Sequence, residues 1–263
     1  MRAVILSVLG VVVVAMTMTG GTAGVDTTAV SLPLNSVIKS ILPTRGEVVG
    51  VAHPVVITFN GPIANRQAAE RAIDVQSNVA MTGKFQWLDD NVVQWVPDRF
   101  WPAHTTIALS VASRPTEFAT GPAVVGVADL SEHTFTVTVD GVATGPAPHH
   151  LPHAGEAGVL LASMGRPDYP TPVDTYTVLS KDRSVIMDSS SVGIPVDDPD
   201  GYRLSVDYAV RISSRGLYVH SAPWAVQSMG YENVSHGCIS LSPATAEWYF
   251  NTVEVGDPVI VQE

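Results

Sequence analysis

The sequence predicts a mainly β fold with two domains, a β-sandwich followed by a second β-rich domain that contains one clear helix. Short segments in which apolar and polar residues alternate recur along the chain, separated by turns rich in Pro, Gly and Asp. A period of two is typical of strands that bury one face. The clearest helix covers residues 242–253, where Ser242 is placed as the N-cap and Pro243 occupies the first helical position.

The first residues have the layout of an export signal. Arg2 precedes an apolar run at residues 3–16, and small and polar residues follow it. The run is shorter than the roughly 20 residues that span a bilayer, so residues 1–24 are predicted to be a signal peptide or an uncleaved signal anchor. Residues 25–42 lack a sustained period and are predicted to be a tether. We therefore expect an extracytoplasmic protein, in the periplasm or cell wall.

Residues 43–128 carry the signals of the sandwich. Strand-like alternation at 55–60 and in the segment 83–112 is interrupted by turns, and residues 64–73 look like one or two helical turns between strands. Trp87, Trp95 and Trp101 are expected to fill the core, because aromatic residues usually pack inside sandwiches. Carbohydrate stacking by Trp101 is the alternative.

Residues 121–130 are interpreted as a joint, and the second domain is predicted over residues 131–262. Its loop at 141–158 contains His149, His150 and His153, which suggest a metal site. Pro148 and Pro152 prevent a helix that would align these rings, and zinc needs three or four convergent ligands. We expect a solvated loop and no metal.

Composition limits the possible partners. The formal net charge is −11, which argues against nucleic acid and against docking on anionic lipid. Membrane contact is expected only through the N-terminal segment, if it is uncleaved. The chain contains one cysteine, Cys238, which cannot form an internal disulfide. On the count alone, a reactive thiol and a small buried apolar residue are equally reasonable interpretations.

The surroundings of Cys238 favour the reactive interpretation. Gly237 precedes it, and backbone N–H groups near the start of the helix would favour a thiolate or a developing oxyanion. A free thiol has a pKa of about 8.5, so it also needs a basic neighbour to react near neutral pH. His220, eighteen positions earlier, lies at a strand end and shares a face with Tyr218. We expect the chain to bring this imidazole to the thiol, whereas His236 is too close in sequence to be an easy choice.

The segment "VHSAPW…NVSHGCISLSPATAEWYF" closely resembles the catalytic signature of the L,D-transpeptidases, the YkuD-type enzymes that cross-link peptidoglycan. The similarity continues upstream through "SMGRPDYPTPVDTYTVLS". The first domain resembles the immunoglobulin-like domain that precedes the catalytic domain in mycobacterial members. The resemblance thus implies an immunoglobulin-like β-sandwich followed by a β-rich YkuD-type catalytic domain.

The family signature also implies catalytic roles. Cys238 would be the nucleophile, and His220 the general base and later the general acid. The carbonyl of Ser221 would help to set the imidazole tautomer. His236 and Gly237 would complete the site, with backbone N–H groups near Gly237 and Cys238 facing the oxyanion.

Substrate-binding roles are implied for a tyrosine that lines the site and assists the oxyanion, a flap methionine, a tryptophan at the pocket edge and two serines of the signature: Tyr202, Met187, Trp224, Ser235 and Ser240. Core packing is the alternative for Tyr202, Trp224 and Met187, and a plain strand-end serine is the alternative for Ser221. Ser240 stands where the family commonly has Asn or Arg, and Val192 where some relatives have Tyr. The shorter Ser240 hydroxyl reaches less far toward substrate.

The activity that the resemblance implies is acyl transfer between peptidoglycan tetrapeptide stems, which act as donor and acceptor, without a metal or organic cofactor. The family also implies that β-lactams of the carbapenem class acylate Cys238. An L,D-carboxypeptidase or a protein-anchoring enzyme would use the same residues with another acceptor. A non-catalytic cell-wall-binding protein is the alternative from a different class.

Overall fold

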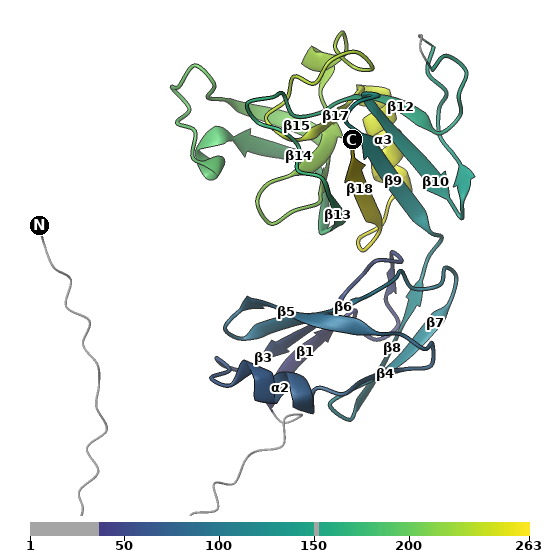
Figure 1. The fold of residues 1–263 in the computed structure, drawn as a ribbon, viewed down its shortest axis with the longest axis vertical. Helices are drawn as coiled ribbons and strands as arrows, with labels where there is room; N and C mark the ends of the chain where they lie inside the picture. Colours follow the sequence, from purple (N-terminus) through teal and green to yellow (C-terminus); the bar gives the residue numbers. More distant parts are fainter. Residues whose placement is uncertain (1–36, 150–152) are drawn as a thin grey trace, which may run out of the picture. The chain divides into compact units, whose positions relative to one another are not determined.

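The computed structural model describes residues 37–149 and 153–263, so the predicted leader and most of the predicted tether lie outside the described residues. The described residues form three β-sheets and two α-helices, α2 (Arg66–Ala72) and α3 (Pro243–Thr252) (Figure 1). This confirms the mainly β fold class. No helix within 37–149 or 153–263 is long and apolar enough to cross a bilayer.

The N-terminal domain is a sandwich of two four-stranded sheets. The strand order is β1-β3-β6-β5 in one sheet and β2-β8-β7-β4 in the other. Apolar residues of both sheets meet in one core cluster. The strands are β1 (Ile38–Leu42), β2 (Val48–Val49), β3 (Val55–Phe59), β4 (Val75–Ser77), β5 (Gly83–Asp89), β6 (Val92–Pro97), β7 (Thr106–Val111) and β8 (Arg114–Thr120).

Aromatic residues fill the core of the sandwich, as predicted. Trp101 is only 2% exposed, its ring lies 5.6 Å from that of Phe118, and its indole N–H donates a 3.0 Å hydrogen bond to the His53 carbonyl. Trp95 is buried, while Trp87 is partly buried. A ring enclosed in this way cannot stack on a sugar, so the carbohydrate role for Trp101 is wrong.

The sandwich begins before Pro43, because part of the predicted tether is a strand. Residues 38–42 form β1 and pair antiparallel with β3. Ile38 is buried against this sheet, but the register shifts between Ile38 and Ser40. This irregularity breaks the alternation that reveals a strand in a sequence.

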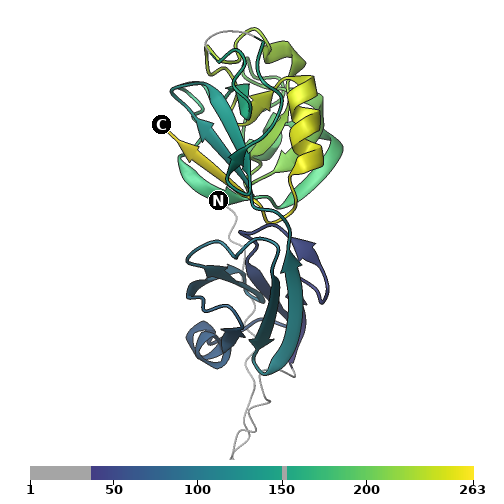
Figure 2. The same ribbon diagram turned by 90° about the vertical axis from the view of Figure 1, so that its right-hand side faces the viewer.

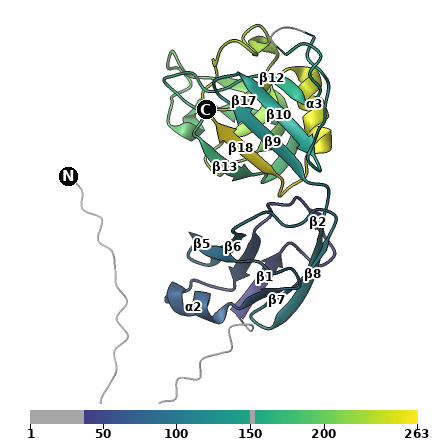
Figure 3. The ribbon, with the colours of Figure 1, turned by 45° about the vertical axis from the view of Figure 1, so that its right-hand side comes forward.

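The C-terminal domain is built on a ten-stranded mixed sheet (Figure 3). Its strand order is β13-β18-β9-β10-β12-β17-β16-β15-β14, with β11 paired to β10. The strands are β9 (Val124–Asp129), β10 (Thr134–Val139), β11 (Val142–Ala143), β12 (Val159–Ser163), β13 (Asp174–Thr177), β14 (Ser180–Asp188), β15 (Arg203–Arg211), β16 (Tyr218–Ser221), β17 (Ile239–Leu241) and β18 (Pro258–Gln262).

The segment interpreted as a joint belongs to this second sheet. Residues 124–129 form β9, which pairs with β10 on one side and β18 on the other. Val124 and Ala128 are buried, and Gly126 lies so close to the Phe135 ring that a Cβ there would come within 2.5 Å of it. The predicted boundary at residue 131 is therefore too late, because pairing with distant β18 cannot be read from a local pattern.

Helix α3 begins where the sequence predicts. The Ser242 hydroxyl accepts a 3.4 Å hydrogen bond from the Thr245 N–H, and Pro243 occupies the first turn. Figure 2 shows the helix, in yellow, beside the strands of the C-terminal domain. Tyr249 is completely buried, and its ring meets Phe135 edge to face at 4.9 Å. This ring contact packs the helix against the sheet.

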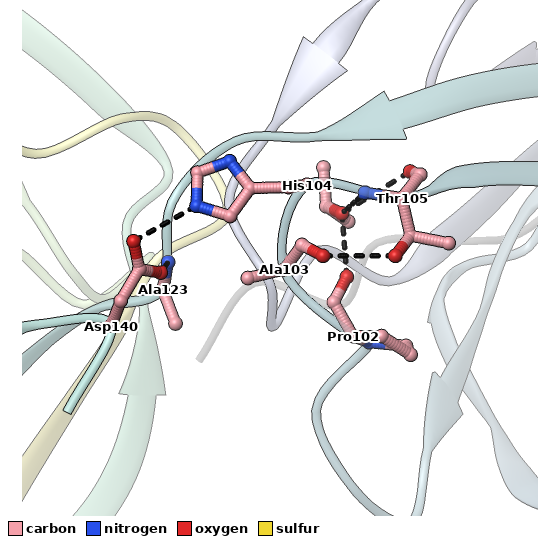
Figure 4. A network of polar contacts seen from close by, with 7 residues as sticks. Pro102, Ala103, His104, Thr105, Ala123 and Asp140 are labelled. Carbon is pink, nitrogen blue, oxygen red and sulfur yellow. Dashed lines mark hydrogen bonds and ion pairs between the residues drawn. The ribbon is translucent and has the colours of Figure 1, made fainter.

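Backbone and side-chain hydrogen bonds join loops of the sandwich to loops of the C-terminal domain. Gly50 N–H donates to the Val255 carbonyl at 2.8 Å, and Ala52 N–H donates to the Gly256 carbonyl at 2.7 Å. Figure 4 shows a second connection, in which Asp140 pairs with the His104 ring at 2.8 Å and accepts a hydrogen bond from Ala123 N–H.

Candidate active site

Two short parallel strands position the candidate catalytic pair. β16 pairs with β17 so that Val219 lies opposite Ile239 and His220 lies opposite Ser240. Cys238 immediately precedes β17, so this register places it beside the strand that carries His220. The backbone of Gly237 has φ +118°, a conformation that L side chains rarely adopt, and this turn leads the chain into β17.

The site is a cavity of about 260 Å³. Its wall contains every predicted site residue except Gly237 and Ser221, which do not line it. The lining residues are Met187, Tyr202, Leu204, His220, Trp224, Ala225, Val234, Ser235, His236, Cys238 and Ser240.

His220 is held as a neutral base. Its ring is 4% exposed, and Nδ1 lies 2.8 Å from the Ser221 carbonyl oxygen, which can only accept a hydrogen bond. The proton therefore sits on Nδ1, and Nε2 keeps its lone pair. Burial lowers the pKa of His220, and the hydrogen bond to Ser221 opposes this effect only in part. The imidazole is thus neutral at pH 7 and able to accept a proton.

Cys238 rests as a thiol. Burial raises the pKa of Cys238 to about 11, although a hydrogen bond from the Tyr218 backbone opposes the shift. Its Sγ lies 3.8 Å from the Gly216 carbonyl oxygen, a geometry in which the thiol donates. The expectation that local donors hold a thiolate is wrong, because the loss of solvent outweighs them.

The turn around Cys238 uses a backbone N–H group that was expected to face the oxyanion. Gly237 N–H donates to the Ser235 hydroxyl at 3.1 Å, and that hydroxyl donates to the Cys238 carbonyl at 2.7 Å. The Gly237 carbonyl accepts a hydrogen bond from the Thr171 hydroxyl. The prediction that Gly237 N–H faces the oxyanion is therefore wrong, because this N–H is used to close the turn.

One wall of the cavity comes from the flap, which we define as residues 187–203, from the last two residues of β14 to the first residue of β15. It contains the short turn η1 (Ser189–Val192). Ser189 is buried and exchanges hydrogen bonds with the backbone of Tyr202, at 2.9 and 3.0 Å. The Tyr202 ring consequently faces the cavity, 4.9 Å from the His236 ring. Burial raises the pKa of Tyr202, and the charge of an ionised Cys238 would raise it further.

Met187 is the last residue but one of β14, and Trp224 lies in the cavity wall, in the short turn η2 (Pro223–Ala225). Trp224 is 58% exposed, and its ring lies 6.2 Å from that of His220. Core packing is therefore not the role of Trp224. Ser240 is buried in the wall opposite His220 in register, whereas Val192 is exposed and does not line the cavity.

Several residues near the cavity escaped the sequence analysis. Leu204, Ala225 and Val234 make its wall more apolar. Tyr169 packs on His236 with the two rings 4.9 Å apart. The Tyr169 segment, "GRPDYP", lies in the stretch that carries the family resemblance, but no local pattern assigns its side chains to the site.

The histidine loop forms no metal centre in the parts of it that the structure describes. His153 pairs with Glu156 at 3.1 Å. No group of three or more His, Cys, Asp or Glu residues that could hold a metal ion occurs among residues 37–149 and 153–263. His150 lies outside the described residues.

Comparisons with known proteins agree with this geometry. The model of the bacterial Ig domain matches residues 15–116, and that of the L,D-transpeptidase catalytic domain matches residues 123–261. The chain is 67% identical to the probable L,D-transpeptidase 3 of Mycobacterium tuberculosis over 271 residues, which covers 100% of both chains.

Solved structures give the same result. A crystal structure of L,D-transpeptidase 3 from Mycobacterium tuberculosis is 71% identical, with a TM-score of 0.84 over 88% of this chain and 100% of that chain. A second structure of that enzyme, in complex with a faropenem-derived adduct, is 73% identical with a TM-score of 0.84, over 86% of this chain and 98% of that chain. The chain belongs to the L,D-transpeptidase family, with a bacterial Ig domain before its YkuD catalytic domain.

Proposed function

We propose that this chain is a peptidoglycan L,D-transpeptidase that joins the third residues of two stem peptides, with Cys238 as nucleophile and His220 as general base. One observation carries the proposal. The β16–β17 register supports it by bringing a thiol and an imidazole with a free Nε2 to the wall of one cavity.

The first half-reaction forms a thioester. Nε2 of His220 takes the proton of Cys238 as the sulfur attacks the carbonyl carbon of the third residue of a tetrapeptide stem. The tetrahedral intermediate collapses, the carbon–nitrogen bond breaks, and the imidazolium protonates the departing D-alanine amine. The acyl group remains on Cys238. The raised pKa of Cys238 and the lowered pKa of His220 support this order, since both groups are neutral before attack.

The second half-reaction releases the enzyme. The side-chain amine of diaminopimelate on a neighbouring stem attacks the thioester carbonyl and loses a proton to His220. The carbon–sulfur bond then breaks, and the sulfur recovers its proton from the imidazolium. Water as the acceptor would give an L,D-carboxypeptidase, and an amine of another protein would give an anchoring enzyme.

Charge on the oxyanion needs donors that are not used elsewhere. Because Gly237 N–H is bound to Ser235, we assign this role to Cys238 N–H and to the Tyr202 hydroxyl on the flap. Removing one such donor typically slows acyl transfer about 10²–10³-fold. The chemistry assigned here to thiol, imidazole and these donors requires no metal or organic cofactor.

We propose that the enzyme acts outside the cytoplasm, where peptidoglycan is cross-linked, and the export signal expected in residues 1–24 supports this location. β-Lactams are expected to acylate Cys238, since their strained amide presents an acyl carbon to the same thiol. The faropenem-derived adduct in the structure of the related L,D-transpeptidase 3 supports this expectation.

Intact-mass analysis tests the proposal. Purified protein incubated with a disaccharide tetrapeptide should gain the mass of the stem without its terminal D-alanine, and free D-alanine should accumulate. Cys238→Ala should show no adduct. A cross-linked dimer identifies transpeptidation, whereas tripeptide alone identifies the carboxypeptidase. An unmodified parent protein with both the stem and faropenem would contradict the proposal.

A further inference from the structure

The segment from Gly165 to Thr171 forms a turn along the catalytic signature. Gly165 makes a parallel bridge with Ser235, and Arg166 N–H donates to the Ser235 carbonyl at 3.0 Å. At the other end of the turn, the Thr171 hydroxyl donates to the Gly237 carbonyl at 2.7 Å. The backbone of this turn is therefore fixed to the loop that carries Cys238.

Two side chains of the same turn bind one carboxylate on the flap. Arg166 donates from Nη2 to Oδ1 of Asp200, and the Tyr169 hydroxyl donates to Oδ2 at 3.2 Å. The Arg166 guanidinium also lies over the Tyr169 ring, 4.8 Å from its centre. Both oxygens of the carboxylate are thus engaged, one by a charged donor, and such bonds are stronger than neutral ones.

Asp200 lies next to the flap residues that touch His236. The Tyr202 ring and the Tyr169 ring both pack on the His236 ring, with ring centres 4.9 Å apart in each pair. A Cβ on Gly201 would come within 2.2 Å of the Pro195 carbonyl, so the flap backbone is tightly folded between Asp200 and Tyr202. A change in the position of Asp200 is therefore expected to move Tyr202 as well.

We propose that Asp200 is a positioning residue. Its bonds to Arg166 and Tyr169 form a latch, which holds the flap and the His236 ring in place at the wall of the active-site cavity. Arg166, Tyr169 and Asp200 do not line the cavity themselves. They act through Tyr202 and His236, which do. The role of the latch in catalysis rests on the proposed function, whereas its effect on the flap does not.

Two experiments test the latch on full-length protein. The first measures hydrogen exchange at Ser189 and Gly201, whose N–H groups bond within the flap. Asp200→Ala and Arg166→Met should each speed exchange there about tenfold and leave β16 and β17 unchanged. Unchanged flap exchange in both variants would overturn the latch, whatever the activity of the parent protein.

The second experiment measures acylation of Cys238 by faropenem and, separately, alkylation by iodoacetamide. The latch variants should lower the acylation rate constant at saturating faropenem about tenfold, and the double variant should lose no more than either single one, because the three groups act as a unit. Alkylation should not slow, because it does not need the flap. Losses that multiply in the double variant, or alkylation that falls in parallel, would overturn the catalytic role.

Two matched controls each remove one charge, an acid or a base, from a flap residue that is not part of the latch. Asp197→Ala deletes an acid three residues before Asp200, and Arg203→Met deletes the base that pairs with Asp188 at 3.6 Å. Both controls should stay within twofold of the parent in exchange and acylation. A tenfold loss in either would show that flap charge, and not the latch, sets the rate. A parent that faropenem does not acylate would contradict the proposed function, and the exchange data would still decide the latch.

Discussion

Cys238 and Asp257 are both ionisable groups whose pKa is raised mainly by burial, yet their surroundings differ. The pKa of Cys238 rises to about 11, and the thiol lines a cavity together with a neutral imidazole. The pKa of Asp257 rises to about 7. This residue is 1% exposed and lies beside Gly50 of the sandwich and Gly256 of the C-terminal domain. Backbone N–H groups of Glu254 and Val51 lower the pKa of Asp257 only in part.

The comparison teaches that burial has two different consequences. Around Cys238, burial keeps the proton on the sulfur, and in the proposed reaction His220 accepts this proton when an acyl donor occupies the cavity. Asp257 does not line the cavity that contains Cys238, and its raised pKa makes the stability of the fold depend on pH. A perturbed pKa therefore indicates catalysis only when access and a proton partner accompany it.

The largest expected effect comes from removing the partner of the thiol. His220→Ala should lower the saturating rate of Cys238 acylation by faropenem about 10²–10⁴-fold, because the sulfur loses its base in the act of attack. Stopped-flow or intact-mass kinetics measures the rate. His53→Ala removes a buried imidazole from the sandwich and should leave acylation within twofold. A loss below threefold in His220→Ala would contradict the role of His220.

A smaller effect, on stability, is expected at Asp257. An acid with a raised pKa in the folded state binds its proton more tightly there, so the folded state is penalised as pH rises from about 4 to about 7. Asp257→Asn removes this penalty. Relative to the parent, the variant should gain a few kcal/mol in free energy of unfolding at pH 8 compared with pH 4.5, measured by urea denaturation.

Asp129→Asn gives the opposite control. Burial raises the pKa of Asp129, but hydrogen bonds from Gln262, Glu132 and Ser131 outweigh it and leave the pKa lowered. Its carboxylate therefore stabilises the fold above its unfolded pKa and loses this contribution as pH falls. The substitution should be more damaging at pH 8 than at low pH. An Asp257→Asn variant with equal effects at both pH values would break the comparison.

Much of the architecture could be predicted because its causes are local. Ser242 and Pro243 mark the start of α3, and alternation marks the sandwich strands. The spacing of His220 and Cys238, with the family signature, identified most of the cavity wall. Strand β9 was misassigned because its partner β18 lies more than a hundred residues away along the chain.

Some details of the site could not be predicted from the sequence, because they depend on contacts that form only in the folded chain. Asp200 meets Arg166 across 34 positions, and only the fold brings the flap over the turn. The Gly237 N–H looked free in the sequence, but the Ser235 side chain captures it in the folded turn. The resting state of Cys238 depends on how fully the surrounding residues exclude water, which residue spacing does not encode.

The pH dependence of Cys238 acylation by faropenem, at saturation and between pH 4.5 and 9.5, tests the central claim most directly. A neutral thiol with a neutral imidazole predicts a rate that rises through an apparent pKa below 6.5, when His220 loses its proton, and then stays level beyond pH 8. In His220→Ala, the level region should disappear. A parent rate that climbs tenfold per pH unit from 6 to 9, as an unassisted thiol requires, would contradict the account.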